Sequence, residues 1–250
     1  MTNTKRPSFR GLFAILCLFV TLGSSCQTRT QALTVFCAAS LSATIEETAR
    51  EESLKLALNS SGSNTLVRQV LAGAESDLLL LADDRLAKEE LVPKGYRLVE
   101  LASNELVVIA PKSASLAKVE RVETLLPNIT ELAVAEAKTA PLGLYTEQAL
   151  QGWPVRAKRI PLQDAGAVVS SVALGHAPYG IVYRSDALAE PKTEILAAIP
   201  QGRHSPVRYV AALKPDASPE AMRLVDSLLQ GKGRKRLEQA GFLPPAPAHQ

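Results

Sequence analysis

The 250-residue sequence has few of the residues from which many protein sites are built. Aromatic side chains make up 4% of it, and it contains three histidines and three cysteines. No Cys-x-x-Cys pair and no cluster of cysteine with histidine occurs, which argues against a structural zinc site. The 46% hydrophobic and 21% charged residues match a globular protein. This composition excludes a collagen, a coiled coil, a disordered tail and a polytopic membrane protein.

No apolar run is as long as the roughly 20 residues that a membrane-spanning helix requires. The most apolar run covers residues 11–22, follows the basic residues Lys5, Arg6 and Arg10, and precedes the small residues 23–25. A basic flank, a short apolar run and small residues are typical of a secretory signal peptide. We therefore expect export to the periplasm or the outer face of a bacterial membrane.

Two cleavage sites fit this signal. Cys26 follows small residues, as in a bacterial lipoprotein whose lipid-bearing first residue is a cysteine, although Leu22 lies four places before it and not three. Ordinary cleavage after Ala32 is the alternative. Either way Cys37 has no obvious disulfide partner, because Cys17 leaves with the leader. We expect a buried structural thiol at Cys37, with an oxidation-sensitive one as the alternative.

The mature chain also lacks an excess of one charge. The formal charge of +3 includes three basic residues of the leader, and without residues 1–25 the chain keeps 25 basic and 25 acidic side chains. A balanced chain has no basic field that would attract nucleic acid. We expect no nucleic-acid partner.

Short apolar runs alternate with amphipathic stretches from Leu33 onward. Residues 33–37 and 77–81 read as strands, and the second is continuously apolar, as in a parallel sheet covered on both faces. Helical spacing predicts helices at 65–71 and 119–126, and the alternation restarts after Pro111. The order of elements predicts an open α/β fold.

We expect two α/β lobes, although no internal repeat supports the division. The predicted ranges are 1–32 for the signal peptide, 33–108 for the first part of lobe 1, 109–205 for lobe 2, and 206–250 for the return to lobe 1 with C-terminal helices.

Four loops place small residues immediately before a predicted helix; they are 38–40, 62–64, 141–143 and 164–166. A helix N-terminus carries unpaired N–H groups and about half a positive charge, so several converging ends would bind an anion. A serine before a helix is more often only a cap, and glycines such as Gly143 and Gly166 are often only turns. The conjunction of the four loops favours the anion.

The residues in these loops resemble the periplasmic molybdate-binding proteins of ABC importers. The motifs are Val35–Leu41, Gly62–Leu66 with Arg68 and Gln69, Pro141–Tyr145 and Gly180–Asp186, in the family's order between about residues 33 and 242. The resemblance implies a two-lobe periplasmic-binding-protein fold of type II. In that fold each lobe is a mostly parallel sheet flanked by helices, and the ligand lies in the cleft between the lobes.

Carried over residue by residue, the resemblance implies five contacts to a tetrahedral oxyanion. Ser40 and Ser63 would donate through hydroxyl and backbone N–H, Leu142 and Ala165 through backbone N–H, and Tyr183 through its phenol. The ligand would be molybdate and also tungstate, so any metal at these residues is that of the bound oxyanion, not a directly ligated ion.

The same resemblance implies transport and not catalysis. The chain would be a monomer without a cofactor that delivers its anion to the membrane permease of an ABC importer. Two places depart from the family's pattern: residues 73–77 read Gly-Ala-Glu-Ser-Asp, and Leu81 stands where a serine is frequent. Neither carries a proposed ligand contact.

Several alternatives stay open at this point. The anion could be sulfate or phosphate, and an effector-sensing domain shares the two-lobe fold, although an exported chain argues against a regulator. Ser40 or Ser63 with His176 or His204 would suit a serine hydrolase, but no Gly-x-Ser-x-Gly surrounds either serine.

A carboxylate metal site is a further alternative. It would use Asp83, Asp84 and Asp164, for which capping or solvated roles are the more frequent reading. Arg68 and Arg184 are left outside the anion site.

Overall fold

A computed structural model describes residues 1–2, 32–138 and 140–245 of the chain. The predicted leader therefore lies almost entirely outside the described residues, as does the cleavage site at Cys26. Among the helices that the model describes, none has the length and apolar character to cross a bilayer.

The first sheet brings together strands from both ends of the chain. Its order is β2-β1-β3-β10-β4. The strands are β1 (Leu33–Ala38), β2 (Leu56–Ser61), β3 (Leu78–Leu81), β4 (Arg97–Asn104) and β10 (Val207–Leu213). β1 pairs in parallel with β2 and β3, whereas β10 runs antiparallel to both of its neighbours.

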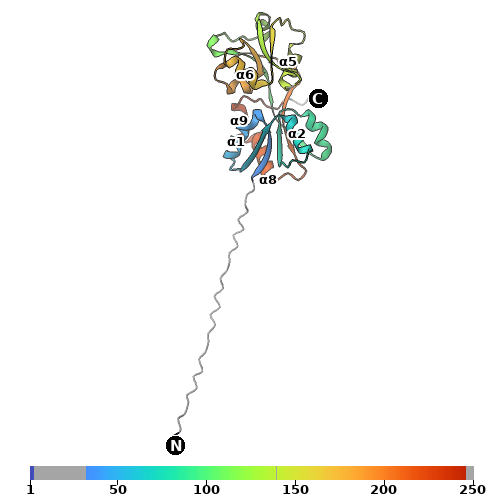
Figure 1. Ribbon diagram of the computed structural model, residues 1–250, viewed down its shortest axis with the longest axis vertical. Helices are drawn as coiled ribbons and strands as arrows, with labels where there is room; N and C mark the ends of the chain where they lie inside the picture. The colour runs from blue at the N-terminus through green and yellow to red at the C-terminus, as the bar shows by residue number, and fades with distance from the viewer. Residues whose placement is uncertain (3–31, 139, 246–250) are drawn as a thin grey trace. The chain divides into compact units, whose positions relative to one another are not determined.

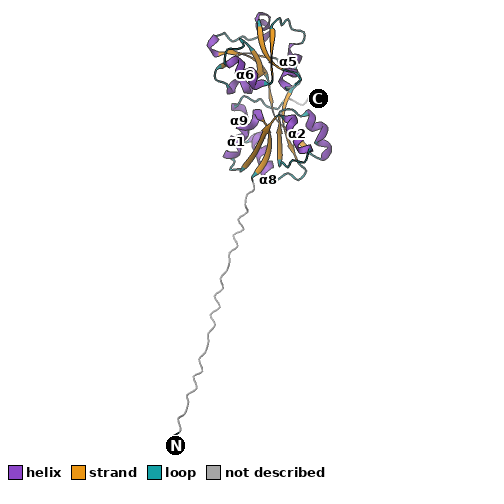
Figure 2. Ribbon diagram, in the orientation of Figure 1, coloured by secondary structure: helices purple, strands orange, loops and turns teal. Residues whose placement is uncertain are grey.

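The second sheet repeats this arrangement without a sequence repeat. Its order is β7-β6-β8-β5-β9. The strands are β5 (Leu106–Pro111), β6 (Glu131–Ala135), β7 (Lys158–Leu162), β8 (Gly180–Tyr183) and β9 (Thr193–Ala198). Here β5 is the strand that runs antiparallel to both of its neighbours, β8 and β9. In each sheet one strand runs antiparallel to the rest. Helices flank the strands of both sheets (Figure 2), so the predicted α/β fold with mostly parallel sheets is confirmed.

The chain passes from the first sheet to the second at Glu105, between β4 and β5, and returns between β9 and β10. The predicted boundary at 108 thus falls inside β5, which pairs only with strands of the second sheet. The assignment of whole lobes to residue ranges stays a prediction.

Helices cover both faces of the first sheet (Figure 1). Those on one face are α1 (Ser42–Glu51), α8 (Pro219–Gln230) and α9 (Lys232–Gln239), and those on the other are α2 (Ser63–Leu71) and α3 (Arg85–Glu90). Alternate residues of β3 enter the two cores: Leu78 and Leu80 one, Leu79 and Leu81 the other. Burial on both faces explains why this strand is continuously apolar.

The second sheet packs against α4 (Val122–Leu125), α5 (Pro141–Leu150), α6 (Ala165–Ala173) and α7 (Arg184–Ala189). The helix predicted at 119–126 is wrong in its first part. The Val119 N–H donates to the Leu196 carbonyl at 2.9 Å, so this residue pairs beside β9 and the helix begins only at Val122.

Candidate anion-binding site

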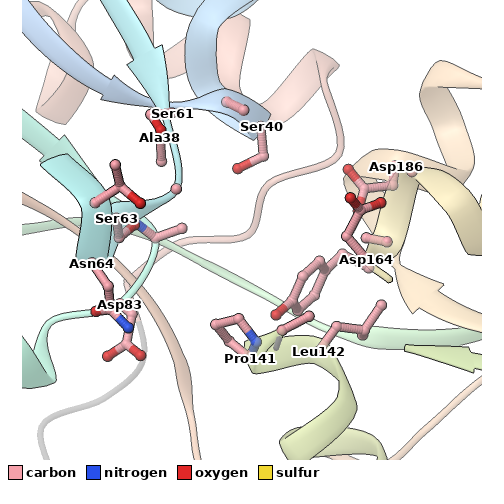
Figure 3. A pocket seen from close by; sticks show the side chains of 18 of the residues that line it. Ala38, Ser40, Ser61, Ser63, Asn64, Asp83, Pro141, Leu142, Asp164 and Asp186 are labelled. Atoms are coloured by element: carbon pink, nitrogen blue, oxygen red, sulfur yellow. The ribbon is translucent and has the colours of Figure 1, made fainter. Parts of the chain in front are cut away.

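Loops of both sheets line one cavity of about 610 Å³, and all five predicted ligand residues, Ser40, Ser63, Leu142, Ala165 and Tyr183, lie in its wall. Figure 3 shows Ser40 and Ser63 across an open space from Leu142 and Asp164. These residues lie at or just after the ends of β1 and β2 in the first sheet and of β6, β7 and β8 in the second.

Ser40 lies in a short 3-10 helix, η1 (Ala39–Leu41), that joins β1 to α1. Ser40 does not cap the following helix, although capping is the more frequent role of a serine before a helix. α1 begins at Ser42, its N-cap is Leu41, and no side chain caps it. The Ser40 side chain is exposed at the cavity and interacts with the hydroxyl of Tyr209 on β10. Because the Ser40 hydroxyl does not cap α1, it lies at the cavity wall beside the Tyr209 hydroxyl.

Ser63 is the first residue of α2, whereas the sequence predicted a loop through Asn64. Its Oγ accepts a hydrogen bond from the Ala82 N–H at 2.8 Å, so its O–H remains free to donate. The N-cap is Gly62, which offers no side-chain acceptor. The N–H groups of the first turn are then left for an external acceptor.

Leu142 is in the first turn of α5, which has Ala140 as an N-cap and Pro141 as its first residue. Proline has no N–H, and the Gly143 N–H donates to the Ala140 carbonyl at 3.0 Å. The Leu142 N–H is therefore the donor that this helix end presents.

Gly143 allows α5 to start so close to β6. A Cβ at this position would lie 2.4 Å from the Ala137 nitrogen and 2.5 Å from the Ala135 oxygen, both backbone atoms. No side chain fits there, so Gly143, for which a simple turn was the alternative reading, sets how closely the first turn of α5 approaches β6.

Ala165 opens α6, whose N-cap is Asp164. The Asp164 carboxylate accepts from the Ala167 N–H at 2.9 Å, which confirms the capping role over the metal-ligand alternative for this residue. The N–H groups of Ala165 and Gly166 precede that bond and have no helical partner. Within the described ranges, no group of three or more histidine, cysteine, aspartate or glutamate side chains could hold a metal ion.

Two tyrosines complete the set of donors. Tyr183 ends β8, and Tyr209 lies on β10, where the Asn104 Nδ2 donates to its hydroxyl at 3.3 Å. Burial raises the pKa of Tyr183 well above its usual value and that of Tyr209 to about 12. Both phenols therefore stay protonated at neutral pH and can donate.

No lysine or arginine lines the cavity in the described part of the chain. The Arg85 guanidinium is held by the buried Asp83 at 2.6 Å, and Arg184 pairs with Glu105 at 2.8 Å. The capping role predicted for Asp83 and Asp84 is not seen: Asp84 is the N-cap of α3 but its side chain does not cap the helix, and the Asp83 carboxylate accepts from the N–H and the side chain of Arg85. The positive potential in the cavity thus comes from helix N-termini and not from cationic side chains.

Sequence reasoning missed Asn64, Asp186 and Tyr209, which also line the cavity. Asn64 and Asp186 lie inside the quoted motifs, one residue after Ser63 and three after Tyr183, so proximity along the chain was the available signal. Tyr209 belongs to β10, which only strand pairing brings to this site.

The histidines do not support a hydrolase. His204 is buried beside Tyr145, with ring centroids 5.8 Å apart, and its Nδ1 faces the Ser205 carbonyl at 2.8 Å. Neither His176 nor His204 lines the cavity that holds Ser40 and Ser63. Neither of these two histidines is therefore placed to act as a base for Ser40 or Ser63.

A cavity between two α/β sheets, lined by neutral donors and helix ends, defines a solute-binding protein of the two-lobe class. The sequence identifies the family within this class. Residues 33–243 match the model of the bacterial extracellular solute-binding proteins, and the chain belongs to this family. The family is one of binding proteins, so the prediction that the chain is not an enzyme is confirmed.

Two named relatives and one solved structure are similar to the chain. It is 33% identical to the molybdate-binding protein ModA of Escherichia coli, over 72% of this chain and 76% of that protein. It is 29% identical to ModA of Haemophilus influenzae, over 84% of this chain and 89% of that one. The periplasmic molybdate-binding protein of Azotobacter vinelandii superposes with a TM-score of 0.68 at 19% identity, over 86% of this chain and 100% of that chain. The predicted resemblance and two-lobe fold are confirmed.

Proposed function

We propose that this protein captures molybdate, and tungstate by the same contacts, outside the cytoplasm and delivers it to an ABC importer. One observation carries the proposal. The N-termini of α2, α5 and α6 open onto the same cavity as the hydroxyls of Ser40 and Ser63, and no cationic side chain among the described residues lines it. A fully deprotonated tetrahedral dianion needs only donors, which these groups supply.

The strength of such contacts suits high-affinity capture. Hydrogen bonds to a charged group contribute about 1.5–3 kcal/mol each when they are well placed. At least five such hydrogen bonds are available, from Ser40, Ser63, Leu142, Ala165 and Tyr183. Part of their free energy offsets the desolvation of the dianion and the closure of the lobes. The remainder is consistent with roughly micromolar or tighter binding. Sulfate is smaller, so donors spaced for molybdate would not all reach it.

The relatives support the same ligand. Two proteins named for molybdate binding align over most of this chain at 33% and 29% identity. We therefore assign molybdate as cargo and no resident cofactor.

Hydrogen phosphate is a second candidate because of the carboxylates of Asp164 and Asp186 in the cavity wall. A protonated anion needs an acceptor for its own hydrogen, and either carboxylate could accept it. Sulfate carries no proton at neutral pH and gains nothing from them.

A thermal-shift panel tests the assignment. Molybdate, tungstate, sulfate and phosphate are compared at equal ionic strength, where an anion at 1,000 times its dissociation constant should add about 4 kcal/mol of stability. We expect shifts of several degrees with molybdate and tungstate only. A shift with phosphate or sulfate alone would keep the fold and replace the ligand, and no shift with any anion would overturn the proposal.

We further propose that the chain is exported and that the mature protein is a monomer with a lipid anchor at Cys26. A soluble periplasmic form that is cleaved after Ala32 is the alternative. The basic, apolar and small residues of the leader support export. Intact-mass spectrometry of the membrane fraction should show a diacylated N-terminus at Cys26. A mature chain that begins unmodified at Leu33 would overturn the anchor.

A further inference from the structure

Asp186 differs from the other acidic residues of the cavity because no described residue pairs with it. It lies in the first turn of α7, three residues after Tyr183, and is half-buried in the cavity wall. Asp83 pairs with Arg85, and Asp164 accepts from the Ala167 N–H. In the part of the chain that is described, no ion pair or hydrogen bond involves the Asp186 carboxylate. An unpaired carboxylate in an anion cavity requires an explanation.

The elements packed against α7 bring little positive charge to Asp186. α6 and β5 contain no charged side chain, and the segment at 241–245 adds none. β9 contributes Glu194, whose carboxylate accepts from the Leu116 N–H, and Arg184 on α7 itself is engaged by Glu105. The remaining titratable neighbours are Asp164, Tyr183 and Tyr209.

Burial and a like charge already favour the protonated form of this group. Desolvation, with a smaller contribution from the Asp164 carboxylate, raises the pKa of Asp186 from 3.8 to about 6. Figure 3 shows Asp164 and Asp186 on the same side of the cavity. A dianion that enters this space adds two more negative charges and must favour the protonated carboxyl further.

We propose that Asp186 takes up one proton from solvent when the oxyanion binds, so that the cavity captures the anion and a proton together. The proton adds to a carboxylate oxygen, and the neutral carboxyl no longer repels the ligand. The inference rests on the proposed oxyanion function and makes Asp186 a determinant of its pH dependence.

Linkage gives the direction of the effect. The anion binds the protonated form more tightly, so its affinity falls as the pH rises above about 6, by up to tenfold per pH unit while one proton is taken up. Above the pKa of the anion-bound state the affinity no longer changes. Asp186→Asn removes the charge at every pH, so this variant should bind molybdate severalfold more tightly than the parent at pH 8.

The stability of the variant is predictable as well. Because the pKa of Asp186 is higher in the folded protein than the 3.8 of an unfolded chain, the folded state holds this proton more firmly. Ionisation of Asp186 therefore destabilises the fold progressively as the pH rises from about 4 to 6. Asp186→Asn should fold and should have a raised Tm at pH 7.

Isothermal titration calorimetry tests the proposal directly. Molybdate, a dianion at pH 6.5, is titrated into the protein in two buffers with different ionisation enthalpies, and the difference in heat counts the protons taken up. We expect a measurable uptake of up to one proton per anion by the parent protein and none by Asp186→Asn. Asp164→Asn is the matched control, and it should keep the uptake with its maximum at a lower pH.

The outcomes separate the two claims. Molybdate binding without proton uptake by the parent overturns this inference alone, whether or not the variant folds. Uptake that persists in Asp186→Asn places the proton elsewhere and also overturns it. A lack of molybdate binding in either buffer overturns the proposed function, and the inference with it.

Discussion

At the scale of single residues, the site depends on hydroxyl groups that look like helix caps and are not. Ser40 and Ser63 each stand where a cap is the ordinary reading, yet α1 and α2 have no side-chain cap. The Ser63 oxygen is occupied by the Ala82 N–H, which leaves its hydrogen for a ligand. Neither hydroxyl is used as a helix cap, and both lie at the cavity wall.

Ser40→Ala and Ser63→Ala should each weaken molybdate binding by about 1–3 kcal/mol, since each removes one hydrogen bond to a charged ligand. Titration calorimetry measures the loss. Ser42→Ala is the control, because its hydroxyl pairs with that of Ser60 at 2.7 Å outside the cavity and its loss should leave the affinity unchanged. Losses below about 0.3 kcal/mol at both Ser40 and Ser63 would contradict their role.

Tyr183→Phe tests the phenol separately. The Tyr183 hydroxyl stays protonated and donates, so its removal should reduce the affinity for molybdate by about as much as the serine variants do. The pH dependence of the affinity should change little. Tyr96→Phe, at a tyrosine outside the cavity wall, provides the comparison. An unchanged affinity in Tyr183→Phe would remove Tyr183 from the set of ligand contacts.

At the scale of elements, the position of a helix end decides whether its N–H groups reach a ligand. The start of α5 is set by Gly143, and α6 lies close to β8 because of Gly180, where a Cβ would come within 2.9 Å of Val168 and Val172. These glycines place two helix N-termini of the second sheet at the cavity.

Gly143→Ala should move the first turn of α5 away from β6, because the added methyl meets backbone atoms that cannot give way. We expect a destabilisation of about 1–3 kcal/mol and weaker anion binding, measured by thermal unfolding and calorimetry. Gly202→Ala is the control, since a Cβ there has nothing within 4 Å. Parent-like affinity in Gly143→Ala would show that the Leu142 N–H is not a contact.

At the scale of the whole molecule, the two sheets meet where the chain crosses between them. The buried Asn104 at the end of β4 donates through Nδ2 to Ser185 on α7 at 2.8 Å and to Tyr209 on β10 at 3.3 Å. This amide joins groups of both sheets beside the cavity, so the crossing and the site share one hydrogen-bond network.

An anion that contacts both lobes should favour a closed arrangement. We expect the radius of gyration in small-angle X-ray scattering to decrease on saturation with molybdate. Ser63→Ala at the same anion concentration should show a smaller decrease, because a smaller fraction is occupied. An unchanged radius in saturated parent protein would contradict closure.

The fold class and the loops that line the cavity could be predicted from the sequence alone. The alternation of apolar and amphipathic stretches predicts the α/β class, because burial requires a period of two in strands and of 3.6 in helices. The strand predicted at 33–37 lies within β1, Leu33–Ala38, and the strand predicted at 77–81 includes all of β3, Leu78–Leu81. The small residues before four helices also identified the loops that line the cavity.

Only the tertiary structure decided which polar groups are hydrogen-bonded within the protein and which are left to interact with a ligand. The Ala82 N–H donates to the Ser63 oxygen, and Val119 pairs beside β9 and not within a helix. Asp186 lies near Asp164 with no hydrogen-bond or ion-pair partner among the described residues. Each outcome depends on neighbours that are distant along the chain. Local propensity carries no information about such neighbours, because they are brought together only when the two sheets form.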